Sequence, residues 1–287
     1  MEMNEIRYFT AVAETQNIHR ASENIGISPS SLSKAISKLE EELKVKLFSR
    51  LGRNIILTTE GIYLKEKAHQ ILNIETQTKL EILGQETTFK AVIGASETLL
   101  SHFGIEIAAK IRKQYPKAQI ELIPVEESVL IQRINDGEVH LGISTYSPPA
   151  SIDSKRVSNV KFHTVVGKNH SLYSIAKKGT SIAVGKVLKY DFVTPKKSIL
   201  GHTNKSKSHD GWRDDKFPRK HTYITSSLNT LNSLIESGQA IAYLPDYFTQ
   251  TKSFEKLNIT GCPHVCKQQV HILTKDKASL GWINHLF

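Results

Sequence analysis

The sequence has little of what marks secreted or membrane-spanning proteins. Its 287 residues include two cysteines, Cys262 and Cys266, which lie too close together to staple a fold. No apolar run approaches the roughly 20 residues of a membrane span, and the first residues lack the basic-then-apolar pattern of a signal peptide. We therefore expect a globular protein of the reducing cytoplasm with no membrane partner.

The length and the distribution of charge limit the interpretation further. A chain of 287 residues is long enough for at least two hydrophobic cores. The net charge is +10, but residues 1–60 hold equal numbers of basic and acidic residues, whereas residues 155–220 hold 16 Lys/Arg and four Asp/Glu. Because the excess lies late in the chain, only motif geometry can indicate a nucleic-acid site.

The first 45 residues have the pattern of three short helices. Apolar residues recur at helical spacing in residues 4–14, which predicts the first helix. Asn17 can cap a second helix that ends near Gly26. Ser28 followed by Pro29 is a strong start signal for a third helix, because the serine oxygen accepts from a free N–H and proline has none.

The third helix combines an apolar face with a face of small hydroxyls and cations. Such a polar face can enter the major groove of DNA and contact phosphates and base edges. For an isolated helix a solvated face is the simpler interpretation, but the preceding helix and turn favour DNA. The candidate DNA-binding residues in this segment are Ser28, Ser30, Ser31, Ser33, Lys34, Ser37 and Lys38.

Residues 47–57 predict a wing beside this helix. They form two short apolar runs around a glycine-containing turn that carries Arg50 and Arg53. Arginines on such a hairpin can reach phosphates or the neighbouring minor groove. We add Arg50 and Arg53 to the DNA-binding candidates.

This segment resembles the helix-turn-helix of LysR-type transcriptional regulators over nearly its whole length. The matching positions are Phe9, Val12, Glu14, Ala21, Ser28, Ser33, Ile36, Leu39, Glu40, Leu43, Leu47, Phe48, Arg50, Leu57, Thr58 and Gly61. The resemblance implies that the third helix reads an operator in double-stranded DNA, that the wing holds the backbone, and that the protein is bacterial.

Two positions depart from the family pattern. The family usually has Gln-Pro after the serine that starts the third helix, whereas this chain has Pro29-Ser30. A glutamine there could pair with adenine, so its loss puts the expected operator sequence in doubt. The family usually has glycine where this chain has Lys44, a change confined to the helix end.

The segment from Thr59 predicts a long linker helix within residues 59–88. Its positions Leu64, Ala68, Ile71, Glu75, Thr78 and Ile82 follow alternating steps of four and three, as in a coiled coil. The family's linker helix pairs two subunits, so Leu64, Ala68, Ile71 and Ile82 are the predicted dimerisation residues, in a homodimer or homotetramer. The alternative is a surface helix of a monomer.

Residues 89–287 predict an effector-binding domain of α/β type. Strands at 89–95, 120–125 and 141–144 alternate with helices at 99–115 and 129–135, which indicates a mostly parallel arrangement. A second set follows, with apolar runs at 163–166, 181–184, 190–193 and 241–244 and a helix at 227–237. The stretch Ile235–Pro245 resembles the glycine-containing segment of LysR-type effector domains.

The resemblance implies the complete domain organisation. Residues 1–58 form the mainly α-helical winged helix-turn-helix, 59–88 the linker, and 89–287 a two-lobed domain that resembles periplasmic binding proteins. The chain crosses between lobes near 161 and 265, so lobe I comprises 89–161 and 265–287, and lobe II comprises 162–264. The overall fold class is α/β.

Polar residues at the carboxyl ends of the strands predict the effector site. Open α/β sheets bind ligands at this edge, and the basic balance of residues 155–220 favours a small anion such as a carboxylate. Plain capping of helix ends is the alternative explanation for these hydroxyls. The candidate effector contacts are Ser96, Thr98, Leu99, Ser144, Thr145, Thr194 and Ser198.

An α/β enzyme with an accessory DNA-binding domain is the alternative function. The stretch from Gly179 to Lys186 has the wrong spacing for a phosphate loop, and Ser31 to Lys34 lacks the companion motifs of a serine acyltransferase. Cys262, His264 and Cys266 make a poor zinc signature, and a redox role for the thiols is a minor alternative. We expect no catalytic residue, metal or cofactor.

Overall fold

The computed structural model describes residues 1–51, 54–84, 87–201, 208–248, 254–277 and 280–287. The N-terminal elements are α1 (Met3–Thr15), α2 (Ile18–Ile25), α3 (Pro29–Leu43), β1 (Phe48–Leu51) and β2 (Asn54–Leu57). All three predicted helices are present, and β1 pairs with β2 antiparallel, as a wing requires.

One small hydrophobic core holds these elements together. The buried side chains of Phe9, Leu32 and Leu39 come from α1 and α3, as their helical spacing predicts. The Phe9 and Phe48 rings lie 5.4 Å apart and connect α1 to the wing. The N-terminal domain therefore has its own core, built from the apolar faces visible in the sequence.

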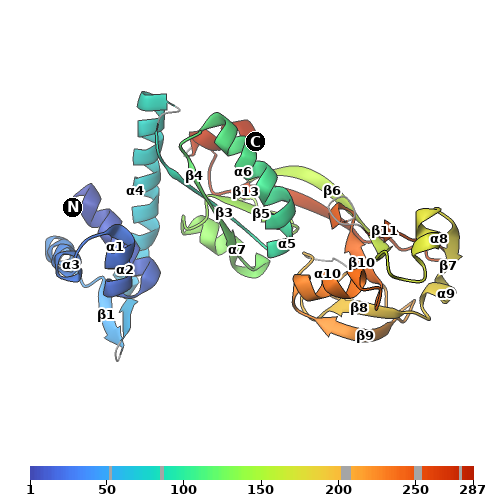
Figure 1. The fold of residues 1–287 in the computed structure, drawn as a ribbon. Coiled ribbons are helices and arrows are strands. Elements are labelled where there is room, and N and C mark those ends of the chain that lie inside the picture. Colours follow the sequence, from blue (N-terminus) through green and yellow to red (C-terminus); the bar gives the residue numbers. More distant parts are fainter. Residues whose placement is uncertain (52–53, 85–86, 202–207, 249–253, 278–279) are drawn as a thin grey trace.

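The linker helix α4 (Thr59–Leu83) begins against the wing and runs past the whole N-terminal domain (Figure 1). The Thr58 side chain caps it by accepting from the backbone N–H of Gly61. Gly61 has no substitute here, because a Cβ would lie 2.1 Å from the carbonyl oxygen of Leu47. Figure 1 shows α1 to α3 on one side of α4 and the C-terminal domain on the other.

After α4 the chain alternates strands and helices in the predicted order. The elements are β3 (Lys90–Ala95), α5 (Glu97–Leu99), the π-helical η2 (Leu100–Gly104), α6 (Ile105–Gln114), β4 (Gln119–Pro124), α7 (Glu127–Asn135) and β5 (Leu141–Ser144). The helix predicted at 99–115 starts earlier, at Glu97, and contains the π-helical turn.

The second set of elements is more complex than the sequence suggested. It comprises β6 (Asp153–Val166), α8 (Tyr173–Lys177), β7 (Ser181–Ala183), α9 (Val184–Val187), β8 (Asp191–Pro195), β9 (Lys220–Thr225), α10 (Leu228–Glu236), β10 (Ala242–Pro245), β11 (Glu255–Lys256), β12 (Asn258–Thr260), β13 (Lys267–Thr274) and the 3-10 helix η3 (Gly281–Leu286). The apolar run at 163–166 is only the end of the long strand β6. The strands β9 and β12, which the apolar pattern missed, are mostly exposed and carry no continuous apolar run. The pattern also missed β13, although most of its residues are buried.

The main sheet has the strand order β10-β6-β13-β5-β3-β4, with β11 also paired to β6. The pairs β3–β4 and β3–β5 are parallel, as predicted for the first set, whereas β6 and β13 pair antiparallel with all their neighbours in this sheet. Figure 1 shows β6 and β13 running side by side between the two halves of the C-terminal domain. These two strands therefore connect two lobes.

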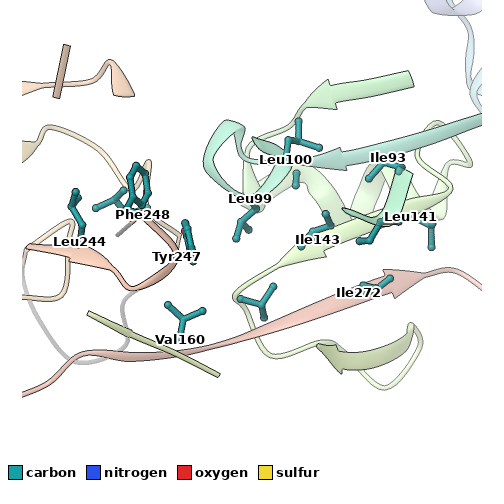
Figure 2. Packing of buried hydrophobic residues seen from close by; sticks show 14 of the residues in the cluster. Ile93, Leu99, Leu100, Leu141, Ile143, Val160, Leu244, Tyr247, Phe248 and Ile272 are labelled. Atoms are coloured by element: carbon teal, nitrogen blue, oxygen red, sulfur yellow. The ribbon is translucent and has the colours of Figure 1, made fainter. Parts of the chain in front are cut away.

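A single hydrophobic cluster crosses the junction between the lobes. It contains Leu99 and Ile143 from the first lobe, Val160 from the connecting strand β6, and Tyr247 and Phe248 from the second lobe (Figure 2). Smaller clusters cover the other face of the first sheet, under α7, and the far end of the second lobe. None of the helices in the described ranges is long and apolar enough to cross a membrane.

Candidate functional site

Ser28 is the cap of α3, the helix predicted to read DNA. Its Oγ accepts from the backbone N–H of Ser31 at 3.1 Å and lies 3.0 Å and 2.8 Å from the hydroxyls of Ser30 and Ser31. These contacts satisfy one of the free N–H groups at the helix start. Ser28 thus orients the helix, and the exposed hydroxyls beside it share one network.

The outer face of α3 presents the remaining candidates to solvent. Ser30, Ser33, Lys34 and Ser37 are exposed or half-buried, while Leu32, Ile36 and Leu39 on the opposite face are buried. Lys34 forms no ion pair with any residue in the described part of the chain. A cation without a carboxylate partner among accessible hydroxyls is suited to a phosphate contact.

Lys38 has a different environment from Lys34. Its Nζ lies 2.8 Å from Glu5 and 3.3 Å from Glu2, both near the start of α1. These hydrogen bonds raise the pKa of Lys38. The structure therefore places Lys38 in a contact between α3 and α1, and the sequence pattern gave no sign of it.

The wing carries Arg50 on β1, opposite Ile55 on β2, with the side chain exposed. Arg53, the other predicted wing contact, lies outside the described residues. The Arg50 side chain makes no hydrogen bond or ion pair with the described residues. An exposed arginine on the wing is suited to a contact with the DNA backbone.

Glu40 fixes the wing to the recognition helix, and this role was not predicted. Its buried carboxylate accepts from the backbone N–H groups of Leu47 at 2.9 Å and Phe48 at 3.2 Å, and from Lys46 Nζ at 2.6 Å. Burial alone would raise the pKa of Glu40, but these three donors outweigh it and lower the pKa. The only signal in the sequence was its place among the family's matching positions.

The predicted dimerisation stripe of α4 is used within one chain. Ala68 is fully buried against the N-terminal core, and Leu64 and Ile71 are partly buried there. Ile82 is 75% exposed. Leu64, Ala68 and Ile71 therefore pack on the N-terminal domain of the same chain, and a fully buried Ala68 offers no surface to a partner, whereas Ile82 stays accessible to one.

A cavity of about 450 Å³ lies between the two lobes. The first lobe contributes residues 96–98 after β3, residues 124–128 after β4, and Tyr146. The second lobe contributes residues 197–199 after β8, Ser226 and Leu228. Of the predicted effector contacts, Ser96, Thr98 and Ser198 line this cavity.

Two of these hydroxyls differ in their partners. Thr98 Oγ1 donates to the carbonyl oxygen of Ile199 at 2.6 Å and so connects the two lobes. Ser96 Oγ is buried and has no hydrogen-bond partner in the described chain. The Ser96 hydroxyl is therefore available to a bound molecule, whereas Thr98 would have to exchange its bond.

Ser144 ends β5 and Thr145 follows it, but both residues donate hydrogen bonds to Glu127. The Glu127 carboxylate accepts from Ser144 Oγ at 3.0 Å, from the Thr145 backbone N–H at 2.5 Å, and from Thr145 Oγ1 at 2.9 Å. The sequence placed the start of the helix at Val129 and so missed Glu127, which lies in its first turn. An acidic residue at that point was the available signal.

The other two predicted contacts lie elsewhere. Leu99 is 1% exposed and belongs to the core at the lobe junction (Figure 2). Thr194 lines a separate hollow of about 480 Å³ on the second lobe, where its hydroxyl lies 3.3 Å from His221 Nδ1. The structure therefore divides the seven predicted effector residues between the inter-lobe cavity, a carboxylate network, the core and a second hollow.

A polar joint connects α4 to the first lobe. His140 Nδ1 accepts from the backbone N–H of Val92 at 2.9 Å, so the neutral ring carries its proton on Nε2, 3.1 Å from Asn73 Oδ1 on α4. His69 is buried against Gly137, where a Cβ would lie 2.5 Å from the His69 Cβ. Burial lowers the pKa of both histidines to about 4.

The cysteines and the acidic and histidine side chains show no metal centre in the described ranges, where no three such groups are placed to hold an ion. Cys262 and Cys266 are both free thiols. Burial raises the pKa of Cys266 to about 11, which disfavours its reactive thiolate form.

Comparison with known families and structures agrees with this architecture. Residues 3–62 match the family model of the bacterial regulatory helix-turn-helix proteins of the lysR family, and residues 87–279 match the LysR substrate binding domain. The regulator BenM of Acinetobacter baylyi is 27% identical over 271 residues, covering 92% of this chain and 85% of BenM. YfeR of Shigella flexneri is 28% identical, over 49% of this chain and 46% of YfeR.

Solved structures show the same fold over the whole chain. A full-length OxyR variant from Pseudomonas aeruginosa has a TM-score of 0.68 at 21% identity, covering all of this chain and 92% of that one. CbnR in complex with its target DNA has a TM-score of 0.58 at 16% identity, covering 99% and 98%. The matched families are those of transcriptional regulators and not of enzymes, and this chain belongs to the LysR family of bacterial transcriptional regulators.

Proposed function

We propose that the protein controls transcription by binding an operator in double-stranded DNA through α3 and the wing, in response to a small molecule bound between the two lobes. The observation that carries this proposal is the combination, in one chain, of an exposed α3 face of hydroxyls and Lys34 and an inter-lobe cavity with an unpartnered buried hydroxyl. We place the protein in the bacterial cytoplasm, where the DNA is.

On the DNA side, Lys34 and the hydroxyls of Ser30, Ser31, Ser33 and Ser37 contact the major groove, and Arg50 and Arg53 hold the backbone. Exposure of the α3 face and the absence of an acidic partner for Lys34 within the described chain support these roles. Lys38 and Ser28 contribute indirectly, by holding α3 in position. Lys38 forms an ion pair between α3 and α1, and Ser28 caps α3. Phosphate contacts carry affinity and base contacts carry sequence preference.

We propose the domain division 1–58, 59–88 and 89–287 for these activities. Lobe I comprises 89–161 and 265–287 and lobe II 162–264, so both crossings fall on or beside β6 and β13. The pairing of Lys161 with Lys267 supports these crossing points. Ligand binding shifts the balance between two arrangements of the lobes only through unequal affinity for them, and the Thr98–Ile199 hydrogen bond is one contact that such a shift would change.

We further propose that the protein acts as a homodimer or homotetramer, so that two recognition helices meet two half-sites. The buried stripe of α4 leaves another face for the partner. Tyr63 and Ile74 are 65% and 61% exposed and lie about three helical turns apart on one side of α4. Substituting both by Glu is expected to give monomers in analytical ultracentrifugation. Ile82→Glu, at a position that the heptad spacing predicts for dimerisation, is the comparison variant.

The experiment that tests the proposed function is fluorescence anisotropy with DNA from beside the protein's own gene. Lys34→Ala and Arg50→Ala should each weaken binding by about 1–2 kcal/mol, and the Arg50 change should do so nearly equally for all sequences. Lys186→Ala, which removes an exposed lysine of lobe II on α9, is the matched control. Unchanged binding by both helix-turn-helix variants, or equal loss by the control, would refute this DNA-binding surface.

A further inference from the structure

The charged side chains that line the inter-lobe cavity are mostly acidic. Glu97, Glu126 and Glu127 line it, and Lys197 is the one lysine or arginine among the described lining residues. The 16 basic residues of segment 155–220 suggested an anionic ligand, but among those that the structure describes only Lys197 lines the cavity. The described lining of the cavity therefore carries more negative than positive charge, opposite to the balance of that segment.

The Glu127 carboxylate is held in a fixed position in this cavity. It accepts hydrogen bonds from Ser144 and Thr145, which are buried to 3% and 7% exposure. These hydrogen bonds use the hydroxyls that a bound anion would need, and Glu127 forms no ion pair with any described cation.

The other carboxylates leave negative charge in excess. Glu126 lies 3.8 Å from Lys197, and both side chains are well exposed, so this pair neutralises one charge weakly. Glu97, which follows Ser96 after the carboxyl end of β3, has no ion pair within the described chain. An anion entering the cavity would meet unbalanced repulsion, whereas a cation would meet attraction.

One further group in the cavity points to a ligand. Ser96 Oγ is buried without a partner in the described chain, and a buried polar atom left unpaired destabilises the folded protein. A hydroxyl oxygen can accept a hydrogen bond from an ammonium group. Pro124, Val125 and Leu228 add apolar walls, and a volume of about 450 Å³ suits a small molecule.

We infer that the effector of the proposed function is a small molecule with at least one protonated amine, which binds among Glu97, Glu126 and Glu127 and donates to Ser96 Oγ. A carboxylate elsewhere on the same molecule would face Lys197. This inference rests on the proposed function and replaces the purely anionic ligand that the charge of the chain suggested.

The test is calorimetry and thermal unfolding of the full-length protein with putrescine, γ-aminobutyrate and succinate, which share a carbon skeleton and differ in charge. Putrescine or γ-aminobutyrate should bind and raise the Tm, and succinate should not. Replacing Glu97 and Glu126 together by Gln should weaken that binding about tenfold. Glu106→Gln, the same change at an exposed position on α6, is the matched control.

Three outcomes would overturn the inference. These are binding of succinate alone with dependence on Lys197, no binding by either amine, or amine binding that the Glu97/Glu126 double variant leaves unchanged. Ser96→Ala should also weaken amine binding, and it leaves the carboxylates in place. Because DNA binding is measured separately, loss of the inference with retained operator binding would leave the proposed regulator intact, whereas loss of operator binding would refute the proposed function itself.

Discussion

The proposed DNA-binding surface and the inter-lobe cavity are assembled from residues at different distances along the chain. The polar face of α3 and the wing occupy residues 28–57, and the Glu40 network that joins them spans eight residues. The cavity collects residues from 96 to 228, and Thr98 meets the carbonyl of Ile199 across 101 positions. The first site is therefore largely a property of local segments, and the second exists only once the lobes have folded.

This difference explains which candidate residues kept their expected environment. On α3, exposure follows from helical spacing, and only Lys38 found an unforeseen partner, on α1. In the effector domain, Glu127 takes the hydroxyls of Ser144 and Thr145, and Leu99 enters the core. A hydroxyl at the end of a strand can be assigned to one edge of the sheet from the sequence. Its hydrogen-bond partner, however, comes from another segment of the chain.

The largest expected effect is in lobe II, where a buried ion network depends entirely on the tertiary structure. Arg219 is buried, forms hydrogen bonds to Asp210 and Asp214, and lies over the rings of Phe192 and Trp212. Arg219→Ala should lower the free energy of unfolding by about 3–5 kcal/mol, because it leaves buried carboxylates unpaired.

Urea unfolding followed by tryptophan fluorescence measures this loss. Arg213→Ala, which breaks only an exposed pair with Asp215, should lower the free energy of unfolding far less than Arg219→Ala does. If the two variants lost the same stability, the buried network would have no special role, and lobe II would depend on its apolar core alone.

The second effect concerns the polar joint between α4 and lobe I. This joint connects the N-terminal part of the molecule to the C-terminal domain. The pKa values of His69 and His140 are lowered from 6.5 to about 4, so both rings are neutral in the folded protein. Above pH 6.5 their contribution to stability is complete. As the pH falls towards 4 the unfolded chain takes up protons that the folded chain does not, which costs up to about 3 kcal/mol for each histidine.

Thermal unfolding between pH 7 and pH 4 tests this joint. His140→Gln cannot take up a proton, so its Tm should start lower than that of the wild type at pH 7 and fall less steeply with acid. The exposed His19→Gln is the control and should follow the wild-type curve. A wild-type Tm that stays constant from pH 6.5 to 4.5 would contradict the buried neutral state of both histidines.

A smaller effect lies within the DNA-binding region. It tests whether this region depends only on contacts between segments that are close together in the sequence. Glu40→Ala removes the acceptor of two backbone N–H groups and should cost about 2 kcal/mol of stability. It should also weaken DNA binding, because the wing loses its fixed position against α3. Chemical denaturation and anisotropy measure the two losses.

The neighbouring exposed residue provides the control for Glu40. Glu41→Ala should change stability by less than about 0.5 kcal/mol. Since the pKa of Glu40 is lowered, its contribution is complete above the ordinary carboxyl pKa and is lost as the pH falls through the folded value. An effect of Glu41→Ala as large as that of Glu40→Ala would show that the wing is positioned by other contacts.

The smallest effect is at the end of α3, where the sequence departs from its family. Lys44 has φ 56°, the left-handed conformation that glycine adopts without a steric cost. Lys44→Gly should raise the free energy of unfolding by about 1 kcal/mol. Glu41→Gly, inside the helix, should lower it by about the same amount, and a loss of stability in both variants would contradict the prediction.

Much of the architecture could be predicted from local pattern. Local signals predict each of the first three helices, and the structure confirms all three. The apolar stripe predicts α1, the Asn17 cap predicts α2, and the Ser28 cap with Pro29 predicts α3. The strand β5 has the predicted bounds, and β3, β4 and β8 lie within two residues of theirs. Short exposed strands such as β9 escaped because they lack an apolar run.

The long linker shows where such a pattern becomes ambiguous. Leu64, Ala68 and Ile71 were correctly identified as an apolar stripe, but spacing alone does not say which surface the stripe covers. In the folded chain that surface is the N-terminal core of the same molecule.

The sequence by itself thus determined the helix-turn-helix, its exposed face and the order of strands and helices, because caps, turns and apolar periodicity act over a few residues. Only the tertiary structure decided the partners of Lys38 and Ser144, the neutral state of His140 and the acidic lining of the cavity. Charge, burial and hydrogen bonding act through space, and segments far apart along the chain supply the groups that set them.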